Sequence, residues 1–164
     1  MAETFLYQGK HLLVDAACKN HDALVNLRLG QDCLEAVVES IGMTMVLPPV
    51  GVKFPNANGE LHRVLKDLEA EGLGQSQTAK SLRQQLHDRA ALNYGYSTFV
   101  MIAESHVSLH TFPEGHFLTF DCYSCRDFDH RPALAVLERF FSFEPGPKIQ
   151  VVDRPFEATL SPQL

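Results

Sequence analysis

Three consecutive segments with strand character, joined by connections of only a few residues, constrain this chain more than any other feature. They cover residues 96–103, 105–111 and 115–123 and are rich in Phe, Val, Ile, Thr and Tyr, which favour β-strands. Connections this short join neighbouring strands that run in opposite directions. The sequence therefore predicts an antiparallel meander over this part of the chain.

Further strands are predicted by apolar runs of strand length outside the meander. They lie at 11–18, after a turn at Gly9; at 43–47, with an extension over 50–55 beyond two prolines; and at 149–152. The short tail after Arg154 contains proline and is expected to be frayed.

Helices are predicted where apolar residues repeat at helical spacing. One covers 22–41, with Asn20 as its N-terminal cap, Gly30 as an interruption and Gly42 as its stop. Another covers 131–141. Both carry apolar residues along one side, so we expect both to pack on a sheet.

The segment 56–90 predicts a helical hairpin. Apolar residues line one side of 60–71 and of 78–90, and Gly-Leu-Gly at 72–74 joins the two. Long charged helices are usually solvated. We therefore expect a surface insertion packed on the edge of the domain rather than a functional lid.

The order of these elements predicts an α+β fold, a two-layer sandwich in which one mainly antiparallel sheet carries helices on one face. A chain of 164 residues with 45% hydrophobic residues is long enough for one continuous core and too short for two domains. We expect a single domain over 1–164, with the helical insertion at about 56–90.

Charge and hydropathy argue against two classes of partner. Fourteen Lys and Arg against twenty Asp and Glu give a net charge of −6, and the basic residues are scattered, so a nucleic-acid partner is not expected. No leader sequence and no window of membrane-spanning length is evident, so no membrane partner is expected. We expect a cytoplasmic protein whose four cysteines stay reduced.

Reactive side chains gather in the meander. Because side chains alternate along a strand, His110, Asp121, Tyr123 and Cys125 are predicted to share the sheet face opposite the helices. Such a polar face needs solvent, a substrate or a second subunit. Ser105 has the other parity, so we expect it at a turn or bulge where its strand starts, a place for a strained and cleavable peptide bond.

Strand geometry disfavours two other chemistries. Cys122 and Cys125 have the spacing of redox and zinc motifs, but on a strand they point to opposite faces, and Cys122 is expected in the core. His106 and His110 share a face, yet their Cα atoms would lie about 13 Å apart. No metal site is therefore predicted. The remaining histidines are expected to be surface or structural residues: His11, His21, His62, His87, His116 and His130.

Two motifs lie close together in the meander, Glu-Ser-His at 104–106 and His-Thr-Phe-Pro-Glu at 110–114, and Cys125 follows them. At this separation they resemble the motifs of the prokaryotic S-adenosylmethionine decarboxylases, which make a pyruvoyl cofactor by cutting their own chain. Gly-Lys-His-Leu at 9–12 and Tyr-Gly-Tyr-Ser at 94–97 match as well. The resemblance covers roughly two thirds of the chain and leaves out the helical hairpin.

The resemblance implies self-cleavage between Glu104 and Ser105. Ser105 would attack the carbonyl of Glu104 to give an ester, and elimination followed by hydrolysis would leave a pyruvoyl group at position 105. This group would form a Schiff base with the substrate amine and accept the electrons released with carbon dioxide. His110 and Ser97 correspond to the family's processing residues, and Cys125 corresponds to its proton donor.

The same resemblance implies a substrate and an assembly. Glu114 would hold the ribose hydroxyls of S-adenosylmethionine, and Phe112, Phe54 or Phe117 would supply an aromatic face for the adenine. The product would be decarboxylated S-adenosylmethionine for spermidine biosynthesis. The family also implies a homodimer of processed αβ units, with the active sites near the contact between subunits.

Two departures from the family pattern leave other functions open. Ala-Leu at 91–92 stands where the family has an adenine-stacking aromatic residue, and Arg126 stands where Gly usually follows the proton donor. A pyruvoyl-dependent L-ornithine or L-arginine decarboxylase on the same fold is therefore the first alternative. The second is a non-catalytic homologue acting as a binding or regulatory subunit, against which Ser105, His110 and Cys125 argue.

Overall fold

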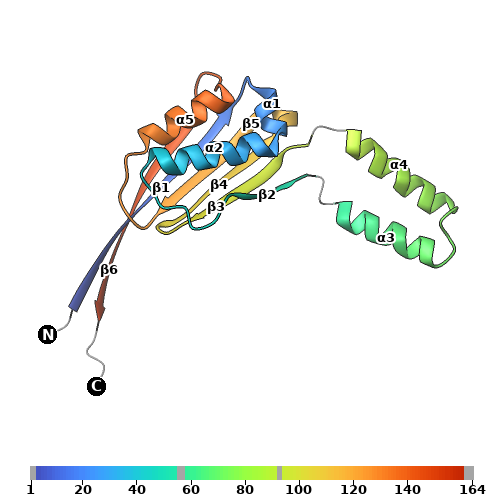
Figure 1. The fold of residues 1–164 in the computed structure, drawn as a ribbon, viewed down its shortest axis with the longest axis horizontal. Coiled ribbons are helices and arrows are strands. Elements are labelled where there is room, and N and C mark those ends of the chain that lie inside the picture. The colour runs from blue at the N-terminus through green and yellow to red at the C-terminus, as the bar shows by residue number, and fades with distance from the viewer. Residues whose placement is uncertain (1–2, 55–57, 92–93, 161–164) are drawn as a thin grey trace.

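A computed structural model describes residues 3–54, 58–91 and 94–160 of the chain, and these contain one antiparallel sheet of six strands in the order β2-β3-β4-β5-β1-β6 (Figure 1). The strands are β1 (Glu3–Ala17), β2 (Val50–Lys53), β3 (Tyr96–Ile102), β4 (Ser105–Phe112), β5 (Phe117–Ser124) and β6 (Lys148–Leu160). The helices are α1 (His21–Val25), α2 (Leu27–Ser40), α3 (Asn58–Ala70), α4 (Gln77–Ala91) and α5 (Arg131–Phe141), and a 3-10 turn η1 covers Pro113–Gly115.

The fold is the predicted α+β sandwich. Helices α1, α2 and α5 cover one face of the sheet, and the core lies between them and the strands (Figure 1). Its fully buried members include Leu12, Val14, Val107, Leu109, Leu118 and Phe120 from the sheet and Leu34, Val37, Leu137 and Phe141 from the helices. Burial of each such side chain stabilises the fold by about 1.5–3 kcal/mol. No helix in the described segments is long and apolar enough to cross a membrane.

The meander 96–124 forms as predicted, but the predicted outer strands need correction. β1 begins at Glu3, so Gly9 lies inside a strand instead of starting one, and β6 continues past Arg154 to Leu160 where a frayed tail was expected. The reason is mutual pairing: β1 and β6 satisfy each other's backbone groups from Glu3↔Leu160 to Asp15↔Lys148. Apolar runs alone do not reveal such a long antiparallel strand pair.

The strand predicted at 43–47 also needs correction. Residues 43–47 contribute a single bridge, Met45↔Ile102, whereas β2 is the expected extension at 50–53. Pro48 and Pro49 separate the two stretches and donate no backbone hydrogen bond.

The helix predicted over 22–41 is divided at Asn26, not at Gly30. The Asn26 side chain accepts hydrogen bonds from the backbone N–H groups of Arg28 and Leu29 and so starts α2. Gly30 lies inside α2, where a Cβ atom would come within 2.3 Å of the Tyr96 ring. The glycine is therefore required for close packing of α2 on β3.

The predicted helical hairpin is present as α3 and α4. It follows β2, precedes β3 and projects away from the sheet instead of lying along the domain edge (Figure 1). Ala79 is fully buried in it, and Arg83 contacts Glu69 at 2.6 Å and donates to the carbonyl of Gly74 at 2.7 Å. The hairpin thus has internal contacts of its own.

A buried hydroxyl ties the meander to the helical layer. The Thr111 Oγ1 atom accepts a hydrogen bond from the Tyr96 N–H at 2.8 Å and donates to the Leu24 carbonyl at 2.8 Å. The Tyr96 hydroxyl donates to the Ala23 carbonyl at 2.8 Å. Gly95 permits the approach, because a Cβ atom there would lie 2.0 Å from the Thr111 carbonyl oxygen. These contacts join β3, β4 and α1 at one end of the sheet.

We expect Thr111→Val to lower the free energy of unfolding by about 2 kcal/mol, because it leaves a buried N–H group and a buried carbonyl without a partner. Urea denaturation of the purified variant measures this loss. Thr78→Val, at an exposed position on α4, is the matched control and should change the value by less than about 0.5 kcal/mol. Equal effects of the two substitutions would contradict this role for Thr111.

Candidate active site

The sheet face opposite the helices, which we call the open face, carries the predicted alternation. On β4, Val107 and Leu109 are fully buried, while His106, Ser108 and His110 are half-buried and face away from the core. On β5, the core-facing Cys122 is fully buried. Burial raises the pKa of its thiol to about 12, so Cys122 is a core residue, as expected.

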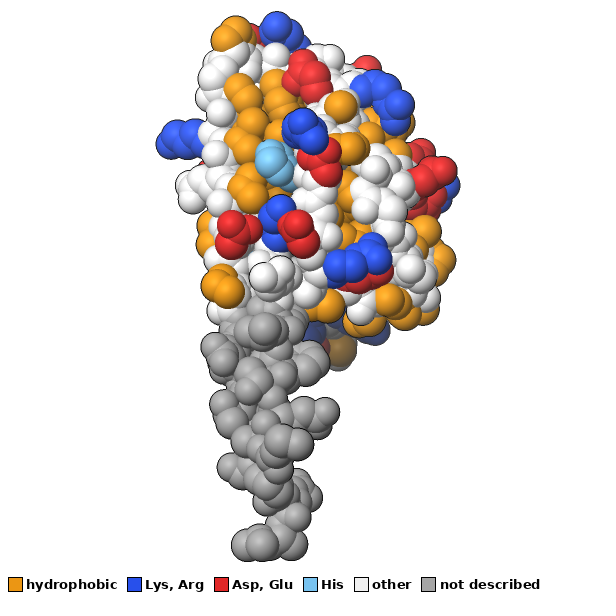
Figure 2. Space-filling model, turned by 90° about the vertical axis from the view of Figure 1, so that its left-hand side faces the viewer, with side chains coloured by type: hydrophobic (Ala, Val, Ile, Leu, Met, Phe, Trp, Pro, Cys, Tyr) orange, Lys and Arg blue, Asp and Glu red, His pale blue; other side chains and the backbone are white. Residues whose placement is uncertain are grey.

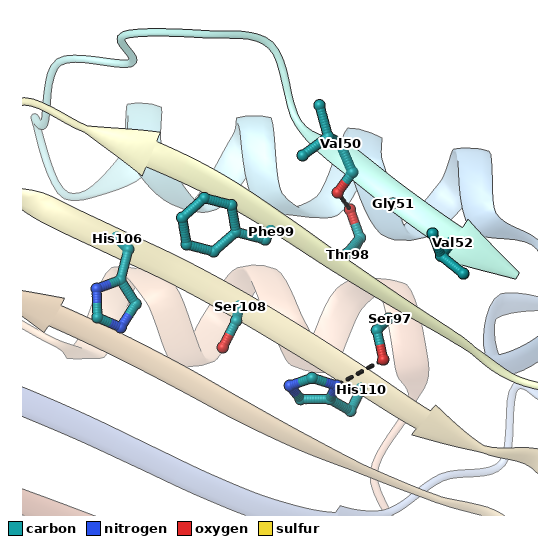
Figure 3. A pocket seen from close by; sticks show the side chains of 9 residues that line it. All are labelled: Val50, Gly51, Val52, Ser97, Thr98, Phe99, His106, Ser108 and His110. Atoms are coloured by element: carbon teal, nitrogen blue, oxygen red, sulfur yellow. Dashed lines mark hydrogen bonds between the residues drawn. The ribbon is translucent and has the colours of Figure 1, made fainter.

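The open face is more apolar than the sequence predicts. Phe99 and Met101 on β3 and Phe117 on β5 are exposed on it, together with Val50 and Val52 on β2. A hollow of about 490 Å³ lies over β2, β3 and β4 (Figure 3). It is lined by Val50, Gly51, Val52, Ser97, Thr98, Phe99, His106, Ser108 and His110. Apolar side chains in such number on one face favour a partner or ligand there.

Ser97 and His110 lie directly opposite each other on β3 and β4 and form what we call the serine–histidine pair. The Ser97 Oγ and the His110 Nδ1 atoms are joined by a hydrogen bond of 2.6 Å (Figure 3). Phe112 lies two residues further along the same face, and its ring stacks on that of Phe117 at 4.5 Å. Glu114 is exposed in η1, directly after this strand.

Ser105 lies at the other end of β4, after a two-residue turn. Ile102 pairs with Ser105 across the hairpin, so only Ala103 and Glu104 make the connection. The φ of Ser105 is 150°, a backbone conformation that residues other than glycine rarely adopt. Such a conformation costs about 1–3 kcal/mol. The irregular backbone lies where the parity of Ser105 predicts it, and the strained torsion lies directly after the peptide bond between Glu104 and Ser105.

Cys125 adjoins this turn. It follows the last residue of β5, it is exposed, and its backbone N–H donates to the Glu104 carbonyl at 2.8 Å. We call Glu104, Ser105, Cys125 and Arg126 the turn cluster. The carbonyl of the peptide bond between Glu104 and Ser105 is thus already polarised by a hydrogen bond.

The structure does not unite all the predicted site residues. Ser105 and His110 are five residues apart on one extended strand, which separates their Cα atoms by about 17 Å. The turn cluster lies at one end of β4, and the serine–histidine pair, Phe112 and Glu114 lie at the other. Within one chain, His110 is too far from Ser105 to move its proton.

A row of residues across the open face joins Asp121 and Tyr123, which were predicted on this face, to partners that the sequence did not connect with them. The ring of Tyr123 lies 5.9 Å from His106 and 5.6 Å from His11, and the His11 Nε2 atom lies 3.1 Å from an Asp121 carboxylate oxygen. The Arg154 guanidinium lies 4.6 Å from the Tyr123 ring. Finding this row from sequence requires the pairing of β1 with β5 and β6, which local patterns do not reveal.

The charged side chains on one face of the molecule are mixed in sign. Acidic and basic side chains alternate over the face seen in Figure 2, without a continuous basic stripe. Among the described residues, no group of three or more His, Cys, Asp or Glu side chains is arranged to hold a metal ion. Leu92, one of the two residues that depart from the family's adenine site, lies outside the described residues.

Comparisons with known proteins agree with the fold and with the motifs. The family model for S-adenosylmethionine decarboxylase matches residues 62–154, more than half of the chain. S-adenosylmethionine decarboxylase proenzyme 2 of Bacillus cereus is 50% identical over 32 residues, 20% of this chain and 26% of that protein. The S-adenosylmethionine decarboxylase proenzyme of Pyrobaculum arsenaticum is 51% identical over 35 residues, 21% of this chain and 28% of that protein. The matched segment thus spans about a quarter of the length of these relatives.

A solved structure extends the similarity to the whole fold. The adenosylmethionine decarboxylase from Aquifex aeolicus superposes with a TM-score of 0.59 and 19% identity, covering 90% of this chain and 91% of that one. The described chain is therefore an α+β sandwich with a strained serine at a hairpin turn. It belongs to the S-adenosylmethionine decarboxylase family.

Proposed function

We propose that the protein is a self-processing decarboxylase that cuts its own chain between Glu104 and Ser105 and then decarboxylates S-adenosylmethionine, yielding decarboxylated S-adenosylmethionine for spermidine biosynthesis. The observation that carries the proposal is the strained Ser105, with φ of 150°, next to a Glu104 carbonyl held by the Cys125 N–H at 2.8 Å. Both features favour attack on that carbonyl.

The first step uses the backbone geometry of the turn cluster. When the Ser105 hydroxyl attacks the Glu104 carbonyl, negative charge develops on the carbonyl oxygen, and the Cys125 N–H stabilises this charge without having to move. Breaking the amide between Glu104 and Ser105 also frees Ser105 from its strained backbone conformation. A serine hydroxyl still needs a group that accepts its proton. His110, hydrogen-bonded to Ser97, is the proposed group.

The residues around position 105 fit a pyruvoyl group. Cleavage would leave it at the first position of β4, beside an exposed thiol and at the rim of the sheet, where a substrate has access. A pyruvoyl group supplies an electron-accepting ketone for decarboxylation. Cys125 is the proposed donor of the proton that replaces the lost carboxylate. Phe112 and Glu114 are the proposed contacts to the adenine and ribose.

We further propose a homodimer in which the serine–histidine pair of one protomer serves Ser105 of its partner. A separation of about 17 Å within one strand is too long for His110 to accept the Ser105 proton inside a single chain. If two copies pack through their open faces with opposed strand directions, the His110 end of one β4 approaches the Ser105 end of the other. Exposed Phe99, Met101 and Phe117 on that face supply apolar area for such a contact.

We expect the purified protein to consist of two fragments, residues 1–104 and 105–164, with a pyruvoyl group in place of Ser105. Ser105→Ala should remain a single chain, because it lacks the attacking hydroxyl. Denaturing mass spectrometry distinguishes the two forms and reports the altered N-terminus. Ser81→Ala, at an exposed position on α4, is the control and should cleave normally. An intact wild-type chain with an ordinary serine would refute the proposal.

Complementation between chains tests the shared site. We expect His110→Ala to stay uncut when expressed alone and to be cleaved when co-expressed with Ser105→Ala, because the second chain supplies the missing imidazole. Different affinity tags identify the cleaved chain on a gel. The double variant Ser105→Ala/His110→Ala is the control partner and should give no rescue. Cleavage of the His110→Ala chain alone would contradict the assignment of His110.

We expect Cys125→Ala to be cleaved yet to release carbon dioxide from S-adenosylmethionine at least a hundredfold more slowly, because general acid catalysis contributes roughly 10²–10⁴ in rate. Radiometric carbon dioxide release measures this. Cys18→Ala, which alters a buried thiol, serves as the control. The same assay with L-ornithine and L-arginine tests the substrate: activity on these alone would overturn S-adenosylmethionine and leave self-processing intact.

A further inference from the structure

Arg126, the residue after Cys125, makes a set of contacts that reaches the cleavage turn. Its Nη2 atom donates to the Gly42 carbonyl at 2.9 Å, lies 3.3 Å from the Met43 sulfur and lies 3.5 Å from the Glu104 Oε1 atom. Its backbone N–H donates to the Ser124 hydroxyl at 2.9 Å. The guanidinium is thus fixed at a definite point on the edge of the turn, although its side chain is 56% exposed.

Glu104 is held from more than one direction. Its side chain is only 14% exposed, and its second carboxylate oxygen, Oε2, accepts the Thr44 N–H at 3.1 Å. Its backbone carbonyl accepts the Cys125 N–H at 2.8 Å. The preceding residue, Ala103, donates its N–H to the Thr44 carbonyl at 2.8 Å. Both the side chain and the backbone of Glu104 are therefore held by several contacts, and Arg126 supplies the positively charged one.

We propose that Arg126 is a positioning residue for self-cleavage, acting through its ion pair with Glu104. This proposal rests on the proposed function. Arg126 holds the Glu104 side chain, which keeps the Glu104 carbonyl against the Cys125 N–H and keeps Ser105 in its strained conformation. An exposed ion pair alone adds little to stability. Its main effect is therefore expected on the rate of cleavage, not on the fold.

Cleavage places additional negative charge on Glu104. In the acyl shift, the Ser105 Oγ bonds to the Glu104 carbonyl carbon, the amide C–N bond breaks, and the hydroxyl proton passes to the nitrogen. In the elimination, the Ser105 Cα proton is removed, the Cβ–Oγ bond breaks, and Glu104 leaves as a carboxylate. Water then adds to the unsaturated residue left at position 105. The nitrogen of this residue departs as ammonia, and the pyruvoyl group remains. Glu104 leaves with a new terminal carboxylate beside its own side-chain carboxylate, and the ion pair with Arg126 keeps the side-chain charge compensated while the second charge forms.

The rate of self-cleavage of freshly translated protein, followed on denaturing gels, tests the proposal. We expect Arg126→Gln to slow cleavage about five- to tenfold and Arg126→Lys to restore most of the rate, because it keeps the positive charge. Arg131→Gln removes a comparable exposed arginine that pairs with Asp129 and should cleave at the wild-type rate. A wild-type cleavage rate in Arg126→Gln would overturn the proposal.

A double-variant cycle separates positioning from a general structural effect. If Arg126 acts through Glu104, Glu104→Gln should slow cleavage by a similar factor, and Arg126→Gln/Glu104→Gln should be no slower than the slower single variant. Multiplicative losses would overturn the proposal. Thermal unfolding of Arg126→Gln in the Ser105→Ala background should match that of Ser105→Ala alone, and a large drop would assign the residue to folding instead. A wild-type chain that never cleaves would refute the proposed function itself, a result distinguishable from all of these.

Discussion

The cross-strand register of β3, β4 and β5 is the constraint on which the rest of the structure depends. With Ile102 opposite Ser105, only two residues remain for the turn, and Ser105, the first residue after the turn, has a positive φ. The same register sets Ser97 opposite His110 and Ser105 opposite Ser124. A slip of one residue would reverse every side chain between core and open face. The hydrogen-bond partners across the strands and the division between apolar core and open face are thus consequences of one pairing.

The helical layer stabilises this register. Tyr96 packs on Gly30 of α2, and Thr111 links the ends of β3 and β4 to the Leu24 carbonyl of α1. A conformational cost of a few kcal/mol at one serine can persist only when its surroundings are more stable than that. A continuous core on one face therefore permits local strain at the rim. The other face, left without helices, remains available for a substrate and a second subunit.

Local patterns in the sequence predicted much of this fold, because each pattern has a physical cause within a few residues. Alternation along β4 and β5, the helical spacing of 131–141 and the cap at Asn20 are examples. Local patterns do not predict features that depend on contacts between residues far apart in the sequence. The ribbon of β1 and β6, the close packing of Gly30 on Tyr96 and the row of His11, Tyr123 and His106 depend on strands distant in sequence. For the candidate site, parity predicted the irregular Ser105, but not its distance from His110.

The order of strands has one more consequence for a chain cut at the turn after β3. The N-terminal piece would contain β1, β2 and β3, and the C-terminal piece would contain β4, β5 and β6. In the sheet, however, β1 lies between β5 and β6. Strands of the two pieces are therefore interleaved within one sheet. Pulling them apart would require three ladders to unzip together, β3 from β4 and β1 from both of its neighbours. A severed backbone can therefore behave mechanically as one body.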